Sequence, residues 1–423
     1  MHVKSKATAY LILFIINILL IILGNPILLL ISSLALLILI FCKAKVSYFS
    51  ELSFILWFSY LQGVLHKVVG VTGSTLAWAG ATMPFYFNEL SIASISFLLT
   101  MLWFVWFTGL ISNEKRLYLY NNRITYQTAM LLQIISVILV ILVFPSIPTF
   151  KMDVALRRTQ GLSGLYGFLL IALILAALTI DQSFKHKKMN LTYLFIVAWV
   201  FGHAERVEIL GFLSYYAIKT LNYYDFGNVR RAIARSHKRK IFIGGVAVLL
   251  LAMWIGMTRM SDISHVNLGL LLYNLLVQPT CGDIVYVFNC ATDLWKNGNA
   301  LHGLTYIDYI LQLIPGFTSA YSPAVVIMKY YTTMGGGLFY TEPMMNFGII
   351  GVVLFNIEFC IVMHFILKKT NRYRTFFWIP IVIEVFRTCW YGRSGWILAA
   401  FIEIPIIYIV IYSVLQHKKK YAV

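Results

Sequence analysis

Long uninterrupted apolar runs, separated by short basic clusters, constrain this chain more than any other feature. Runs of about 20 apolar residues recur along its whole length, and each is long enough for a helix to cross the roughly 30 Å hydrocarbon core of a bilayer. Of the 423 residues, 60% are hydrophobic and only 12% are charged, a balance that ordinary soluble domains do not have. The runs do not alternate polar and apolar residues, which excludes a transmembrane β-barrel. The sequence therefore predicts an all-α polytopic membrane protein.

Positive charge is concentrated beside the apolar runs, as the positive-inside rule predicts for cytoplasmic loops. The net charge of +18 therefore does not indicate a nucleic-acid partner. The strongest cluster, RRAIARSHKRK at residues 230–240, is interpreted as a topology anchor beside anionic lipid. The expected partner of this basic chain is the bilayer.

About twelve transmembrane helices, counted from a cytoplasmic N-terminus, place every basic cluster in the cytoplasm. The expected helices cover residues 7–24, 26–42, 50–69, 91–111, 124–144, 161–180, a short pair within 189–221, 241–257, 343–367, 375–391 and 395–414. The short pair lies between two basic clusters, so the chain either crosses and returns, with its two helices meeting at the outer side near Arg206, or enters the membrane as a re-entrant pair. Residues 1–423 thus form a single membrane domain with both termini cytoplasmic.

One large polar segment, residues 258–341, interrupts this pattern between the helices at 241–257 and 343–367. It is far longer than a turn between membrane helices requires, and the charge pattern places it outside the cytoplasm. Long loops on a rigid scaffold often carry binding and catalysis. We therefore expect the chemistry in this loop and at the outer ends of the helices.

Arginines near the predicted outer surface are candidates for binding an anion. Arg387 and Arg393 lie in FRTCWYGRSGW, between the last two helices, and Arg206 is expected at the same depth. A guanidinium grips phosphate oxygens with two hydrogen bonds, whereas lysine acts as a point charge. The alternative for Arg206 is an internal ion pair with Glu205 or Glu208 that closes the helix hairpin.

The loop supplies further ionisable candidates: Arg259, His265, Asp283 and His302. Each of them, taken alone, is better explained as a solvated loop residue than as a catalytic one. Glu342 follows the run GGGLFYT at the start of a helix, where a carboxylate also complements the helix dipole. Among these residues a carboxylate or histidine could accept a proton from a substrate hydroxyl.

Several common sites are absent from the sequence. There is no Walker loop, Rossmann fingerprint, HExxH or zinc spacing, and no Asp-x-Asp that would hold a metal-bound sugar nucleotide. No cofactor or metal is expected. Cys281 and Cys290 share the large loop, and a disulfide between them is the less favoured interpretation.

Four segments, taken in order, resemble the Wzy-type bacterial O-antigen and capsule repeat-unit polymerases. They are HAERVEILGFLSYY (203–216), GDIVYVFNCATDLWKNGNALHGLTYIDYILQLIP (282–315), GGGLFYTEPMMNFGIIGV (335–352) and YGRSGW (391–396). The resemblance covers most of the chain from about 190 to 400. It implies a multi-pass inner-membrane glycosyltransferase that joins undecaprenyl-diphosphate-linked oligosaccharide repeat units on the periplasmic face, without a metal. A chain-length regulator and a flippase are the protein partners that it implies.

The resemblance also implies site residues. Those matching the motifs are Arg206, Asp283, Gly303, Tyr306, Gly336, Gly337, Glu342, Asn346 and Arg393. We accordingly expect Arg206, Arg387, Arg393 and Arg259 to bind diphosphate and Glu342, Asp283 or His302 to act in catalysis. Tyr306, Tyr321, Asn346, Gly336 and Gly337 are expected to bind substrate. Aromatic residues of the loop, such as Tyr321 and Tyr330, are equally explained as a belt at the membrane interface.

Two other functions remain open at this point. An O-antigen ligase would use the same lipid-linked donor and share nearly all of these features. A lipid-linked oligosaccharide flippase also has about twelve spans, but it should need only short loops.

Overall fold

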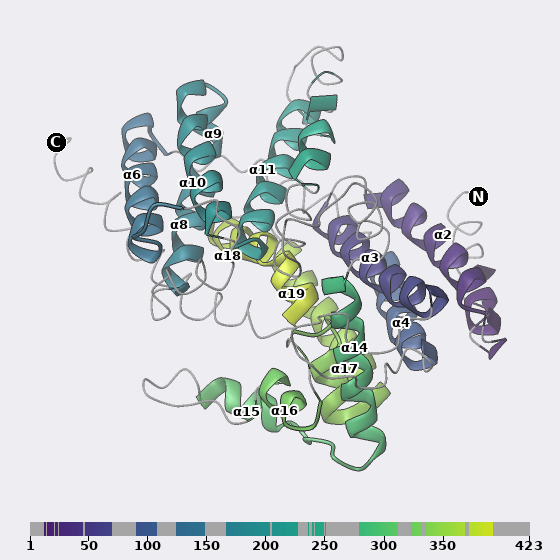
Figure 1. Cartoon of the computed structure of the whole chain (residues 1–423). Coiled ribbons are helices and arrows are strands. Elements are labelled where there is room, and N and C mark those ends of the chain that lie inside the picture. The colour runs from purple at the N-terminus through teal and green to yellow at the C-terminus, as the bar shows by residue number, and fades with distance from the viewer. Residues whose placement is uncertain are drawn as a thin grey trace. The chain divides into compact units, whose positions relative to one another are not determined.

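The computed structural model describes a little under two thirds of the chain. The described residues are 12–13, 15–20, 22–23, 25–44, 47–69, 90–107, 124–148, 166–203, 205–226, 236, 239–240, 242–248, 250, 279–311, 321, 323–331, 333, 336–368 and 372–391. Every regular element in these ranges is a helix, and no strand occurs within them (Figure 1). The predicted all-α class is confirmed for this part of the chain.

The chain forms two compact units, and stretches of the two units alternate along the sequence. Unit 1 comprises residues 1–111, 265–365 and 388–394, and unit 2 comprises residues 112–264, 366–387 and 395–423. Both units therefore contain segments that are far apart in the sequence.

The described part of unit 1 consists of helices that pack against one another. Its helices are α2 (Pro26–Ala44), α3 (Tyr48–Val69), α4 (Leu90–Phe107), α14 (Pro279–Lys296), α15 (Leu304–Leu311), α16 (Pro323–Tyr330) and most of α17 (Thr341–Leu367). The Asn25 side chain begins α2 by accepting the amides of Ile27 and Leu28, as an N-cap does. Tyr60 of α3 bonds Ser94 of α4 at 2.8 Å, so buried polar groups join neighbouring helices.

The described helices of unit 2 come from residues 112–264 and 366–387. They are α6 (Tyr126–Val143), α8 (Tyr166–Leu178), α9 (Ile180–Ser183), the short 3-10 helix η5 (Lys187–Met189), α10 (Asn190–Gly202), α11 (Val207–Phe226) and α18 (Arg372–Ile383). α19 (Val385–Tyr391) contributes to both units. Thr125 caps α6 by accepting the amide of Thr128, and α6 packs along α8.

Most of the predicted helices agree with the structure in the part of the chain that it describes. Helices are confirmed within a few residues at 26–42, 50–69, 91–111, 124–144, 161–180 and 343–367. The prediction of one helix at 375–391 is wrong, because the structure divides this range into α18 and α19. The short pair is also confirmed, because α10 ends at Gly202 and α11 begins at Val207. Arg206 lies in this junction, as predicted. The predicted helix at 395–414 lies outside the described residues.

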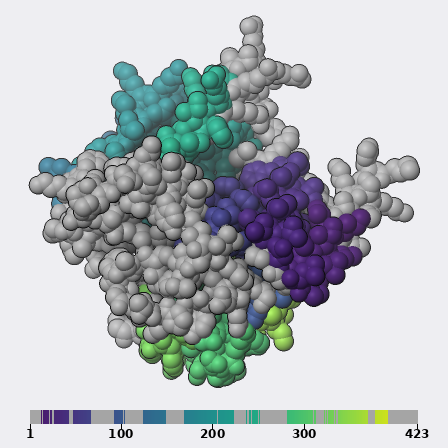
Figure 2. All heavy atoms as spheres, turned by 45° about the vertical axis from the view of Figure 1, so that its right-hand side comes forward, coloured from purple at the N-terminus to yellow at the C-terminus, as the bar shows by residue number. Residues whose placement is uncertain are grey.

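Several helices carry their apolar side chains on the exposed face. In α6 the buried residues include Thr128, Gln133 and Ser136, whereas Ile134 and Ile138 are about half exposed. α2 forms part of the surface in Figure 2, where its atoms are purple, and it exposes isoleucines and leucines. Among the described helices, α6 and α17 are long and apolar enough to cross a membrane.

Candidate functional site

The large polar segment contains a buried helix that the sequence analysis did not anticipate. In α14 all side chains from Cys281 to Thr292 are buried, and the helix packs against α3 and α4 of unit 1. The lack of a side chain at Gly282 permits this contact, because a Cβ there would lie 2.5 Å from the ring of His66. Asp283 therefore lies inside a helix bundle, with only 1% of its surface exposed.

His302, the second predicted catalytic residue, lies at the surface in an unusual backbone conformation. The amide of Leu304 bonds the carbonyl of Leu301 at 2.9 Å. The two residues between them, His302 and Gly303, have φ of 46° and 91°. Two positive φ angles at the centre of a four-residue turn are typical of type I′. Histidine tolerates this conformation better than most residues, and its side chain is exposed.

The buried side chain of Asn346 holds this turn against α17. Its Oδ1 accepts the amide of Gly303 at 2.7 Å, and its Nδ2 donates to Thr305 Oγ1 at 2.7 Å and to the carbonyl of Glu342 at 2.9 Å. These three bonds join the turn, α15 and the first turn of α17. The structure therefore attaches the turn that contains His302 to Asn346 and Glu342 of α17, which lie 40 or more positions further along the chain.

Glu342 begins α17 but is not open to solvent, because its exposed fraction is 4%. The glycine run before it is also ordered by contacts within unit 1. Gly336 has φ of 86°, which only glycine adopts without strain, and the amide of Gly337 bonds the carbonyl of Trp390 at 2.7 Å. Trp390 in turn donates from Nε1 to Ser59 of α3 at 3.1 Å. The glycine run is thus in contact with Trp390, the residue directly before the YGRSGW segment.

Unit 2 holds a second cluster, in which Arg387 joins two buried carboxylates. Nη2 of Arg387 donates to Oε1 of Glu208, and Nε lies 3.5 Å from Oε2 of Glu384. The two glutamates are at most 6% exposed, whereas the arginine side chain is 40% exposed. Arg387 therefore bridges the two buried glutamates through Nη2 and Nε.

The remaining predicted residues are dispersed or undescribed. Arg206 is half-buried beside Glu208, Tyr306 is half-buried on α15, and Tyr321 is exposed. Arg259 and Arg393 lie outside the described residues. The predicted contact between Arg206 and Arg393 therefore stays a prediction. Glu208, two residues after Arg206, forms an ion pair with Arg387.

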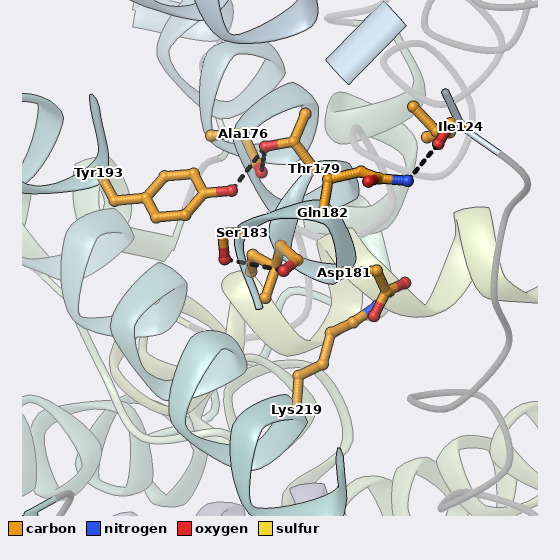
Figure 3. Close-up of polar contacts among 9 residues, drawn as sticks. Ile124, Ala176, Thr179, Asp181, Gln182, Ser183, Tyr193 and Lys219 are labelled. Atoms are coloured by element: carbon orange, nitrogen blue, oxygen red, sulfur yellow. Dashed lines mark hydrogen bonds and ion pairs between the residues drawn. The ribbon is translucent and has the colours of Figure 1, made fainter. Parts of the chain in front are cut away.

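A buried ion pair in unit 2 was missed by the sequence analysis. Lys219 of α11 bonds Asp181 of α9 at 2.9 Å, as Figure 3 shows, and the ammonium lies 5.9 Å from the ring centroid of Tyr215. Beside it, the hydroxyls of Thr179 and Tyr193 are 2.7 Å apart. The available signal was a single charge within each of two otherwise apolar runs, at 181 and at 219.

The cysteines of the polar segment are unpaired thiols in α14. Cys281 and Cys290 are both free and buried, so they form no disulfide. Burial raises the pKa of Cys290 to about 12, which keeps this thiol protonated and unreactive. In the described parts of the chain, no group of three or more His, Cys, Asp or Glu side chains is placed to hold a metal ion.

The candidate residues thus fall into two groups, one in each unit. Unit 1 contains Glu342, Asp283, His302, Asn346, Tyr306 and the glycine pair, and unit 2 contains Arg206 and the Arg387 cluster. The first group offers possible proton acceptors, and the second offers an arginine whose side chain is 40% exposed. Comparison with family models, curated proteins and solved structures finds no match for the chain.

Proposed function

We propose that the protein is a multi-pass bacterial inner-membrane glycosyltransferase that polymerises undecaprenyl-diphosphate-linked oligosaccharide repeat units on the periplasmic face. The exposed apolar faces of the described helices support the membrane location. A helix that buries glutamine, serine and threonine while exposing isoleucine, as α6 does, is stable only if its outer face meets hydrocarbon.

The proposed reaction transfers a growing glycan between two lipid carriers. A hydroxyl oxygen of the acceptor sugar forms a bond to the anomeric carbon of the donor glycan, and the bond from that carbon to the diphosphate oxygen breaks. The electron pair leaves with the undecaprenyl diphosphate, and the hydroxyl proton passes to a base. Arginines stabilise the departing negative charge electrostatically.

The geometry distinguishes the candidates for the base. Glu342 and Asp283 are 4% and 1% exposed, so an acceptor sugar reaches them only after a rearrangement. His302 is exposed and needs none. We therefore assign the base to His302 in this conformation and give Glu342 a supporting role at the start of α17.

The observation that carries the proposal is the pairing of Arg387 with Glu208. It joins Glu208, inside the first of the four resembling segments, to Arg387, which lies just before the fourth. The cluster of Arg387, Glu208 and Glu384 sums to one negative charge. Binding a diphosphate here therefore requires a second cation, the role that we give to Arg206 and Arg393.

Deletion of the gene followed by gel analysis of surface glycan tests the proposal. A polymerase deletion should remove the ladder of glycan lengths but retain a single attached repeat unit. Complementation with Arg387→Lys should restore the ladder poorly, because one ammonium cannot bridge Glu208 and Glu384 as the guanidinium does. Arg239→Lys, at an exposed position, is the matched control and should restore it fully.

Other outcomes of the same experiment would overturn the proposal. Loss of all attached glycan would indicate the ligase. Loss of attached glycan together with lipid-linked units accumulating in the cytoplasmic leaflet would indicate the flippase. An unchanged ladder would exclude all three functions for this chain under the conditions of growth.

A further inference from the structure

The short helix α15 buries its polar face against the protein and exposes its apolar face. Thr305 and Asp308 are 1% and 2% exposed, whereas Ile307 and Ile310 are 56% and 63% exposed. Leu304 and Leu311 extend the exposed apolar face, at the spacing that puts residues on one side of a helix. A helix in water would turn its isoleucines inward and its aspartate outward.

The polar face of α15 is fastened to the first turns of α17. Gly303, just before α15, and Thr305 within it both bond the side chain of Asn346 at 2.7 Å. A Cβ at Gly303 would also lie 3.4 Å from the ring of Phe347. The position of α15 along the axis of α17 is therefore fixed, at residues 346 and 347.

That position corresponds to the boundary of a bilayer. α17 bends at Gly348, whose φ of 63° and ψ of −149° are not helical. The part after the bend, residues 349–367, is about 28 Å long, close to the thickness of the hydrocarbon core. The exposed apolar side chains of α17 begin at Phe347 and continue through Ile350, Leu354, Ile361 and Phe365. The preceding turns, with Glu342 and Asn346 buried against the protein, extend beyond the hydrocarbon. α15 is attached at this limit.

We propose that α15 is an interfacial helix whose apolar face is inserted into the outer leaflet of the membrane. Phe347, the first exposed apolar side chain of α17, lies against Gly303 at the start of α15, which is why bilayer hydrocarbon, rather than a protein partner, is the occupant we assign to the exposed face of α15. Exposed Tyr321 and Tyr330 and exposed Lys329 of the same segment are residues that favour the headgroup region. This inference depends on the membrane location in the proposed function.

The placement has a consequence for substrate chemistry. His302 immediately precedes Gly303, so an inserted α15 holds its imidazole at the depth of lipid headgroups. The diphosphate of a polyprenyl carrier lies at the same depth, with its sugar directly outside. The depth of His302 therefore suits a sugar attached to a membrane-bound diphosphate. A soluble nucleotide sugar does not need a catalytic residue at the depth of the lipid headgroups.

Spin labelling of the full-length protein in lipid nanodiscs tests the inference. The exposed Cys42 is first replaced by serine, and single labels are then attached at Ile307→Cys, Leu354→Cys or Asn299→Cys. Collision with oxygen reports exposure to lipid, and collision with a water-soluble nickel chelate reports exposure to water. Ile307 should resemble Leu354, with collision by the nickel chelate about tenfold lower than at exposed Asn299 and high accessibility to oxygen.

Two results would overturn the inference while leaving the proposed function intact. Equal nickel collision at Ile307 and Asn299, with Leu354 protected, would place α15 in water. Protection of Ile307 from both oxygen and nickel would show that protein, either a partner or a second copy, covers it. Nickel access at Leu354 itself would instead refute the membrane location and with it the proposed function. None of these readouts requires catalytic activity.

Discussion

Replacing Asn346 with alanine should destabilise unit 1 by about 3 kcal/mol and release the turn that carries His302. The side chain is fully buried and makes three hydrogen bonds, to Gly303, Thr305 and Glu342. Each contributes about 1 kcal/mol net, and their partners would remain buried without a bond. The turn would also lose its attachment, because His302 at φ 46° is held there at a cost of roughly 1–3 kcal/mol.

Asn356 provides a matched control in the same helix. It is equally buried and makes two bonds, to Thr100 Oγ1 at 3.1 Å and to the carbonyl of Val352 at 2.9 Å. Hydrogen bonds between membrane helices contribute about 0.6 kcal/mol on average. Asn356→Ala should therefore cost about 1 kcal/mol and leave the turn unaffected.

Unfolding in mixed micelles by added dodecyl sulfate, followed by tryptophan fluorescence, measures the two free energies. Hydrogen exchange read by mass spectrometry gives the local effect, because the amide of Gly303 loses its acceptor only in Asn346→Ala. A double-mutant cycle with Thr305→Val should show a coupling of about 1 kcal/mol. Equal destabilisation by the two alanine variants, with unchanged exchange at residues 301–304, would refute the role assigned to Asn346.

Three further predictions use the same stability assay or simple chemistry. Gly348→Ala should lower the free energy of unfolding by about 3 kcal/mol or more, because φ is 63° and a Cβ would lie 2.2 Å from the ring of Trp295. Its control, Gly298→Ala, has φ of 76° but open space around it, so it should lower the free energy of unfolding by only about 1 kcal/mol. Asp181→Asn should cost roughly 3 kcal/mol by leaving the Lys219 ammonium buried and uncompensated, and the double variant with Lys219→Met should regain most of it; no recovery would contradict this. Because burial raises the pKa of Cys290 from 9.0 to about 12, its contribution to stability is complete below pH 9 and is lost as the pH rises toward 12. Iodoacetamide at pH 8 should therefore alkylate Cys290 only after unfolding, as peptide mass spectrometry will show.

The helices were predictable because their signal is local. Apolar runs near membrane length gave α2, α3, α6 and α17 almost to their ends, and the interruption at 203–206 correctly divided α10 from α11. These predictions needed only composition and length, since a helix that crosses a bilayer satisfies its own backbone.

The buried helix α14 and the inverted helix α15 were not predictable in the same way. α14 mixes Asp283 with apolar residues, and that pattern suits a solvated loop as well as a helix packed against α3. Long-range contacts also decided the functional residues. Nothing local to Asn346 indicates its bond to Gly303, and nothing local to Arg387 indicates its pairing with Glu208.

Reconstitution of the purified protein into proteoliposomes with an undecaprenyl-diphosphate-linked repeat unit tests the central claim most directly. We predict that the lipid-linked unit is converted into a ladder of longer lipid-linked glycans, with release of undecaprenyl diphosphate and without added metal or nucleotide. A His302→Asn variant creates the Asn-Gly pair that type I′ turns prefer, so it should fold normally but give little elongation. Retention of the substrate as a single unit by folded wild-type protein, or its transfer only to a lipid A acceptor, would contradict the assignment as a polymerase.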